Sequence, residues 1–169
     1  MAPSFSALNG KLVTIFGGGG FVGRHAAQAL MQTGARVRIV QRHPERALAI
    51  RALGNLGQTQ FVAADARNAD HVARATTGSD AVVNLISVMA GDLDESNVRT
   101  AANIAAAARD HGVGALVHLS AIGADAASPA AYGRSKAAGE AAMRAAMPGA
   151  TVLRPSVIFG RQDQFINRF

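Results

Sequence analysis

The residue types best suited to proton transfer in this chain are a tyrosine and a lysine, four positions apart. Tyr132 is the only tyrosine among the 169 residues, and Lys136 is one of two lysines in a chain that otherwise uses arginine. On a helix, this spacing brings both side chains to one face, one turn apart. An ammonium beside a phenol favours the phenolate form, which can exchange a proton with a carbonyl or alcohol oxygen. The alternative is a tyrosine that packs on a lysine stem on an exposed helix face.

A second pattern indicates phosphate binding. The glycines of residues 17–23 read as G-x-x-G-x-x-G from Gly17, or as G-x-G-x-x-G from Gly18. Glycine lets the backbone approach a pyrophosphate, and the following helix points its N-terminal amides at the anion. A flexible turn is the alternative, but the loop follows a predicted strand and precedes a predicted helix, which favours dinucleotide binding. The expected cofactor contacts along this loop are Gly17, Gly20, Phe21, Val22 and Gly23.

The residue type at the end of the second predicted strand indicates whether a site binds NAD or NADP. NAD sites usually place Asp or Glu there, where it accepts hydrogen bonds from the ribose hydroxyls. This chain has Gln41-Arg42-His43 instead, with no acid before Glu45. Arg42 suits the 2′-phosphate of NADP, because a guanidinium matches phosphate oxygens two at a time, and Arg24 is expected to close on the same phosphate. NADP is therefore the predicted cofactor and NAD the second choice; for Arg42, a solvated loop arginine is the alternative.

Asp65 directly follows the third predicted strand, in the stretch AADAR. We expect its carboxylate to accept a hydrogen bond from the adenine amino group, and an Asx turn or helix cap is the alternative. Three apolar residues complete the expected cofactor contacts: Ala66, Leu85 and Pro155.

Strands and helices must position these residues, and the chain alternates short β-branched runs with alanine-rich stretches. The predicted strands are residues 11–16, 36–41, 59–63, 80–87, 113–119 and 150–153, with 157–159 as the start of another. The predicted helices run from the glycine loop to residue 32, then over 44–56, 69–77, 97–111 and 128–147, the last capped by Ser128. Such alternation implies crossover connections and a parallel sheet. The predicted fold is one doubly wound α/β Rossmann domain over residues 1–169.

Composition sets wider limits. Hydrophobic residues make up 49% and charged residues 17%, which is too apolar for a disordered chain. Because there is no cysteine and the five histidines lack ligand-like spacing, no metal site is predicted, and His118 is expected in the core. A net charge of +6 favours anionic partners, but the scattered arginines and missing aromatic platforms argue against nucleic acid. No signal-peptide pattern opens the sequence, so a cytoplasmic location is expected.

Taken together, the motifs resemble the short-chain dehydrogenase/reductase superfamily. The shared features are GGGGFVG after the first strand, Asp65, the run DAVVNLIS, and YGRSK as Y-x-x-x-K. Asn97 with the helix after it, and the segment LRPSVIFG, are similar to the extended and atypical branches, which include NAD(P)-dependent epimerases and dehydratases. Within these, the chain is most similar to the family of Rossmann-fold accessory subunits of respiratory complex I and their bacterial relatives.

The resemblance implies a parallel sheet of about seven strands, a bound nicotinamide dinucleotide and a Ser/Tyr/Lys active site. Tyr132 would be the acid and base, Lys136 its electrostatic partner and ribose ligand, and Asn97 part of a water-mediated proton path. Ser120 would be the serine, but active members place a Ser or Thr slightly later, where this chain has Ile122. The family also continues well beyond LRPSVIFG, so most of the C-terminal substrate lobe is expected to be missing here.

Two functions follow from these expectations. The first is hydride transfer between NADP(H) and a carbonyl, alcohol or nucleotide-sugar substrate, with Tyr132 handling the proton. The second is a non-catalytic NADPH-binding accessory or assembly subunit of respiratory complex I, located at the inner-membrane surface. The isoleucine at the expected hydroxyl position agrees with the second function.

Overall fold

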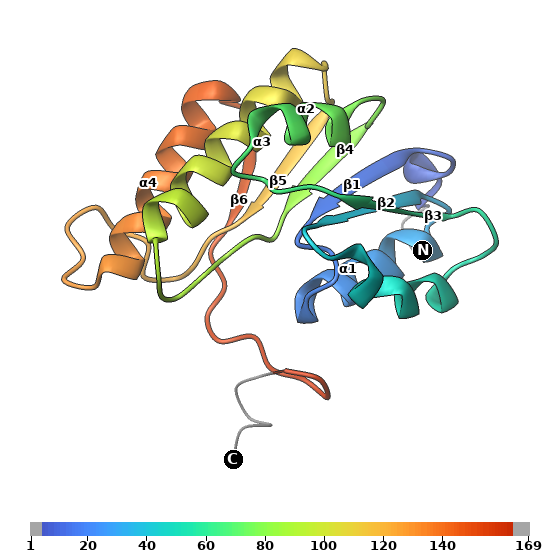
Figure 1. Cartoon of the computed structure of the whole chain (residues 1–169), viewed down its shortest axis with the longest axis horizontal. Coiled ribbons are helices and arrows are strands. Elements are labelled where there is room, and N and C mark those ends of the chain that lie inside the picture. Colours follow the sequence, from blue (N-terminus) through green and yellow to red (C-terminus); the bar gives the residue numbers. More distant parts are fainter. Residues whose placement is uncertain (1–4, 164–169) are drawn as a thin grey trace.

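The computed structural model of the protein describes residues 5–163 and contains one parallel six-stranded sheet. The strands are β1 (Leu12–Phe16), β2 (Arg36–Gln41), β3 (Thr59–Ala63), β4 (Ala81–Asn84), β5 (Ala115–Leu119) and β6 (Thr151–Leu153). Their order is β3-β2-β1-β4-β5-β6, and every neighbouring pair is parallel (Figure 1). This is the doubly wound order, in which the direction of winding reverses between β1 and β4. The predicted fold class is confirmed.

Helices cover both faces of the sheet. They are α1 (Phe21–Gln32), α2 (Ala69–Thr76), α3 (Thr100–Asp110) and α4 (Ala131–Ala146), with 3₁₀ turns η1 (Phe5–Leu8) and η2 (Pro44–Leu53) and a π-helical turn η3 (Asp94–Arg99). In Figure 1, α2, α3 and α4 lie on one face, and α1 lies on the other. The helix α1 packs with η2 beneath β1, β2 and β3.

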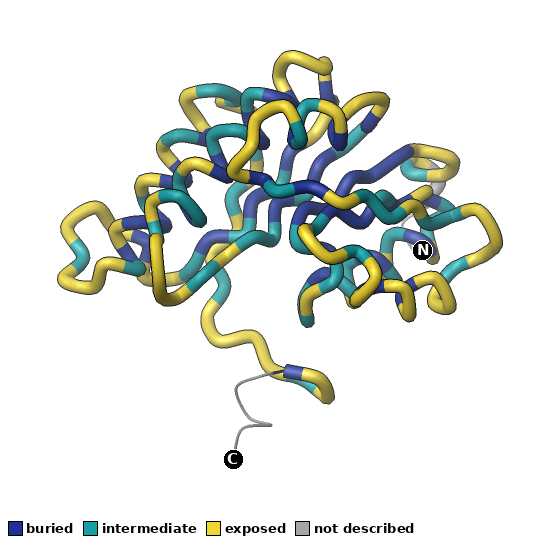
Figure 2. Tube along the Cα trace, viewed as in Figure 1, coloured by how far each residue is buried: buried dark blue, intermediate teal, exposed yellow. Residues whose placement is uncertain are grey.

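Each face has its own apolar core, seen as dark segments along the strands in Figure 2. Phe16, Val82 and Leu116 pack with the helices α2, α3 and α4, whereas Ile15 and Ile39 pack with α1 and η2. All five residues of β1 are buried, because this strand lies in the middle of the sheet and is covered on both sides. The continuous apolar run of β1 reflects this double burial.

The structure corrects several predicted boundaries. Residues 44–56 form only 3₁₀ turns that end at Leu53, and residues 157–159 form no strand. Ser128 does not cap α4, which begins at Ala131; the Ser128 Oγ accepts a hydrogen bond from the Ala130 N–H in the preceding turn, at 3.3 Å. A β-carbon at Gly133 would lie 2.5 Å from the Ser128 Oγ, so this turn packs against the side of the helix. Within residues 5–163, no helix is both long and apolar enough to cross a membrane.

Candidate functional site

A cleft opens at the carboxyl ends of the neighbouring strands β1 and β4. Its volume is about 360 Å³, and Phe16, Gly17 and Gly20 are among the residues that line it. Parallel sheets bind their ligands at this kind of reversal point. The adenosine side, as the fold class defines it, is lined by Val40, Gln41, Arg42 and residues 64–67. The opposite side is lined by residues 85–88, Ser96 and Thr100.

The glycine loop has the geometry of a pyrophosphate cradle in the register that begins at Gly17. Gly17 has φ +77°, a conformation that favours glycine, and makes the tight turn after β1. A β-carbon at Gly23 would lie 2.4 Å from the Gly18 carbonyl oxygen, so Gly23 lets α1 pack against the loop. Gly20 is the N-cap of α1, with no capping side chain and no acid in the first turn. The residues present therefore fit a diphosphate at the start of α1.

The structure does not bring Arg24 and Arg42 together. Arg42 is exposed and lines the cleft, next to Gln41, whose Nε2 donates to the His43 carbonyl oxygen at 2.6 Å. Arg24 instead lines a separate hollow of about 470 Å³ between α1 and η2, and its Nη1 donates to the Gln162 Oε1 at 2.7 Å. Of the two, Arg42 alone faces the space that a dinucleotide would occupy.

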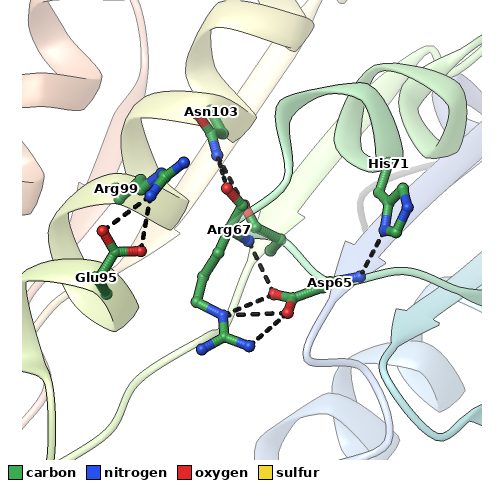
Figure 3. Close-up of polar contacts among 7 residues, drawn as sticks. Asp65, Arg67, His71, Glu95, Arg99 and Asn103 are labelled. Carbon is green, nitrogen blue, oxygen red and sulfur yellow. Dashed lines mark hydrogen bonds and ion pairs between the residues drawn. The ribbon is translucent and has the colours of Figure 1, made fainter.

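Asp65 forms an Asx turn, which was the alternative to an adenine contact in the sequence analysis. Its Oδ1 accepts a hydrogen bond from the Arg67 N–H at 3.0 Å, and the Arg67 guanidinium binds both carboxylate oxygens (Figure 3). Asn103 of α3 donates to the Ala66 and Arg67 carbonyl oxygens, both at 3.0 Å. The hydrogen bond from Arg67 lowers the pKa of Asp65 to about 2. The carboxylate is thus ionised and held by Arg67, while the adenine contact stays a prediction.

Tyr132 and Lys136 lie on α4 as the spacing predicts, but their side chains have different surroundings. Tyr132 is half-buried, and its Oη lies 3.3 Å from the Ser87 Oγ, on the loop after β4. Lys136 is only 1% exposed, and its Nζ donates to the Leu119 carbonyl oxygen at 2.9 Å. Burial lowers the pKa of Lys136 to about 8, although Glu140 opposes this shift. The pair is therefore not a surface contact on an exposed helix face.

Asn97 ties the loop after β4 to the helix α4. It is 2% exposed; its Oδ1 accepts from the Val88 N–H, and its Nδ2 donates to the Val88 carbonyl oxygen, both at 3.0 Å. Its Nδ2 also donates to the Ser135 Oγ at 3.1 Å, and Ser135 lies between Tyr132 and Lys136 in the sequence. The side chain of Asn97 therefore fixes the position of this loop relative to Tyr132.

The hydroxyl that lies next to Tyr132 is Ser87, which the sequence reasoning missed. Ser120, predicted as the catalytic serine, is 5% exposed and lies on the α4 side of β5, near Glu140. Ile122 is 69% exposed, and its N–H donates to the Pro155 carbonyl oxygen at 2.9 Å. The position of Ser87 in the sequence was the signal that could have found it: Ser87 closes the apolar run DAVVNLIS, and β4 within that run pairs with β1, which leads into the glycine loop.

The fold and the cleft define a dinucleotide-binding Rossmann protein, and comparison with known proteins assigns its family. The model of the NAD dependent epimerase/dehydratase family matches residues 13–169. The chain belongs to this family, which confirms the resemblance drawn from the sequence.

Relatives of known name fall into two groups. The mouse and Dictyostelium discoideum proteins named NADH dehydrogenase [ubiquinone] 1 alpha subcomplex subunit 9, mitochondrial, are 36% and 37% identical, over 97% and 95% of this chain. A Caulobacter vibrioides ceramide reductase is 34% identical over 90% of the chain. The chain covers 45%, 46% and 48% of these three proteins, so it spans about half of their length.

Solved structures show the same fold at lower identity. The UDP-glucuronic acid 4-epimerase of Bacillus cereus, in complex with NAD, superposes with a TM-score of 0.74 at 19% identity. That match covers 88% of this chain and 58% of the epimerase. WbmG of Bordetella bronchiseptica, also in complex with NAD, has a TM-score of 0.70 at 22% identity, over 91% of this chain and 55% of WbmG. At this identity, the likeness supports the fold alone.

Proposed function

We propose that this chain is the cofactor-binding part of an NADP(H)-dependent oxidoreductase that acts on a carbonyl, alcohol or nucleotide-sugar substrate. The observation that carries the proposal is the position of Tyr132. Its hydroxyl meets Ser87, a residue that lines the cleft, and Lys136 is buried one helical turn along the same helix. A phenol in contact with a cleft-lining serine and an ammonium on the same helix are the groups that proton exchange with a substrate oxygen requires.

Each part of the cleft has a role in this proposal. The bound dinucleotide supplies the hydride, and the loop with Gly17, Gly20 and Gly23 holds its pyrophosphate together with the first-turn amides of Phe21 and Val22. Arg42 binds the 2′-phosphate, Lys136 holds the nicotinamide ribose, and Asp65 meets the adenine. Ala66, Leu85 and Pro155 supply apolar contacts. Arg24 joins the 2′-phosphate site only if its side chain leaves the hollow beside Gln162.

Tyr132 performs the proton chemistry. Its Oη donates a proton to a carbonyl oxygen during reduction and takes one back during oxidation. Ser87, within hydrogen-bonding distance of that Oη, positions the phenol and offers a second hydroxyl to the substrate oxygen. Asn97 holds the Ser87 loop in place through Val88.

A second candidate function is a non-catalytic, NADPH-binding accessory or assembly subunit of respiratory complex I. Two observations favour it. The relatives at 36% and 37% identity are named as subunits of NADH dehydrogenase. Ile122 and Ser120 supply no hydroxyl next to Tyr132 at the end of β5. In this role, bound NADPH would stabilise the folded state by mass action, and the surface of the domain would dock on the complex.

The test combines binding and turnover. We expect NADPH to raise the melting temperature more than NADH does, because only NADPH offers a 2′-phosphate to Arg42. Turnover is then followed at 340 nm against ketones, quinones, nucleotide sugars and ceramide-related lipids, the last because one relative is named a ceramide reductase. The variant Tyr132→Phe removes only the hydroxyl and is expected to lower turnover about 100-fold while NADPH binding is kept.

The outcomes separate the two functions. Binding of NADPH without turnover on any substrate, in wild type and Tyr132→Phe alike, supports the accessory-subunit function. Turnover that Tyr132→Phe leaves unchanged contradicts the catalytic role of Tyr132. If neither dinucleotide raises the melting temperature, both candidate functions are wrong.

A further inference from the structure

Two oppositely charged side chains are buried on the sheet-facing side of α4. Lys136 is 1% exposed and Glu140, one helical turn later, is 3% exposed. Lysine and glutamate are almost never fully buried unless they are paired, because taking either charge out of water is costly. The proposed function uses Lys136 but gives no role to Glu140.

Glu140 is held by Arg154, which directly follows β6. The Arg154 Nε donates to the Glu140 Oε1 at 2.9 Å, and its Nη2 donates to the Oε2 at 2.8 Å, so the pair is bidentate. Burial acts to raise the pKa of Glu140, but the hydrogen bonds from Arg154 and the charges of Arg154 and Arg144 lower it below its usual value. The carboxylate is therefore ionised and fixed in one orientation.

Lys136 has no such direct ion pair. Its Nζ donates to the neutral carbonyl oxygen of Leu119, which leaves two N–H groups for other partners. The titratable groups that interact with it are His118 from β5 and, on its own helix, Glu140. His118 is neutral near pH 7, because burial and the charge of Lys136 lower its pKa to about 4. Glu140 is thus the one anion that acts on Lys136 within the described residues.

We infer that Glu140, clamped by Arg154, is a positioning residue that keeps the buried Lys136 charged while two of its N–H groups stay free for the cofactor. This role rests on the proposed function, in which the ammonium holds the cofactor's ribose and acts on Tyr132. The carboxylate of Glu140 is fixed by Arg154, and its charge acts on Lys136 without a direct hydrogen bond that would occupy the N–H groups. The competing explanation is purely structural: the Glu140–Arg154 pair joins α4 to the end of β6.

The titration of Lys136 separates these explanations, and the composition of the chain makes it measurable. With two lysines, protein labelled with ¹³C-lysine gives two ε-methylene NMR signals, and Lys11, whose side chain is 53% exposed, is an internal reference. In the ligand-free wild type we expect the Lys136 signal to titrate near pH 8. Removing the negative charge in Glu140→Gln is expected to lower this midpoint by about one pH unit or more.

A second variant is expected to act in the opposite direction. Arg154→Met removes the cation that is hydrogen-bonded to Glu140 and leaves Arg144 and Lys136, each one turn away on α4, as the cations near the carboxylate. The Lys136 midpoint is therefore expected to rise by about half a pH unit or more. The matched control is Glu95→Gln, which removes an exposed glutamate that pairs with Arg99 one turn away on η3. This control is expected to leave the Lys136 midpoint unchanged.

The results have distinct meanings. Opposite shifts in the two variants support the inference, and an unchanged Lys136 midpoint in either folded variant overturns it. If Glu140→Gln does not fold, as judged by the dispersion of its amide signals, Arg154→Met alone decides. Because the titration uses ligand-free protein, failure of NADPH to bind contradicts the proposed function without affecting this measurement.

Discussion

At the end of β2, the position whose residue type distinguishes NAD sites from NADP sites carries no carboxylate. The Gln41 amide is bound to the His43 carbonyl oxygen, and the nearest acid in the cleft, Asp65, is held by Arg67. Arg42 lines the cleft beside them, and within residues 5–163 its guanidinium makes no hydrogen bond or ion pair with another side chain. A guanidinium that forms no ion pair, next to a carboxylate that Arg67 already binds, favours an incoming phosphate.

Arg42→Ala is expected to weaken NADPH binding about 10- to 100-fold, the usual size for a charge-assisted hydrogen-bond pair, with little change for NADH. Isothermal titration calorimetry with both dinucleotides measures this selectivity. Arg46→Ala is the matched control, because Arg46 lies nearby in the sequence but lines the hollow between α1 and η2. Equal losses of NADPH and NADH affinity in Arg42→Ala contradict a role in recognising the 2′-phosphate.

At the scale of elements, close approaches of helices to loops position the site. The helix α1 meets the glycine loop at Gly23, and α4 meets η3 at Gly139, where a β-carbon would lie 2.7 Å from the Asn97 carbonyl oxygen. The second approach brings Asn97 to the loop that carries Ser87 and to Ser135 beside Tyr132. Small residues at these points therefore set how far the proton-transfer residues lie from the cleft.

Gly23→Ala tests the first of these approaches. The new β-carbon would meet the Gly18 carbonyl oxygen at 2.4 Å, so α1 or the loop must move. We expect a loss of about 1–3 kcal/mol in the free energy of unfolding, from overpacking, together with weaker binding of both dinucleotides. Gly149→Ala is the control, because nothing lies within 4 Å of a β-carbon there. Urea denaturation and calorimetry measure the two effects; a fully stable Gly23→Ala variant with normal binding contradicts the packing argument.

The sequence predicts the elements better than it predicts the contacts between them. The strands 36–41 and 59–63 have the predicted bounds, because each is a short segment with β-branched residues between turn residues. The start of α4 was predicted three residues too early, because the packing of Ser128 against Gly133 depends on tertiary structure. Ser87 was missed for a similar reason: its contact with Tyr132 spans 45 residues and depends on the loop that Asn97 holds.

At the scale of the whole molecule, the two faces of the sheet differ in what they bury. The face toward α1 and η2 is packed with apolar side chains. On the α4 side, the carboxyl ends of β4 and β5 bury a polar layer that includes Asn84, His118 and Ser120, at 0%, 1% and 5% exposure. Together with Lys136 and Glu140, this layer lies beneath the proposed site. Burial shifts the pKa values of the titratable groups in this layer, and these shifts couple the stability of the fold to pH.

His118 is the imidazole of this layer, and its protonation couples the stability of the fold to acid. The Asn84 Oδ1 accepts a hydrogen bond from the Ile86 N–H, so its Nδ2 faces the His118 Nδ1 at 3.1 Å, and that nitrogen must accept. Protonation of the His118 Nδ1 would place its N–H against the N–H donors of the Asn84 amide and add a positive charge beside Lys136. Burial and Lys136 lower the pKa of His118 from 6.5 to about 4. Since the unfolded chain binds this proton more readily, the free energy of unfolding falls as pH decreases from 6.5 to 4.

Between pH 7 and pH 5, this coupling is expected to remove ~2 kcal/mol from the free energy of unfolding of the wild type. His118→Gln retains an acceptor for the Asn84 amide but cannot be protonated, so its loss over the same interval is expected to be smaller by that amount. His111→Gln, at the exposed end of α3, is the control and should behave like the wild type. Urea denaturation at both pH values provides the comparison. If the wild type and His118→Gln lose equal stability, the buried imidazole is not the group that makes this fold sensitive to acid.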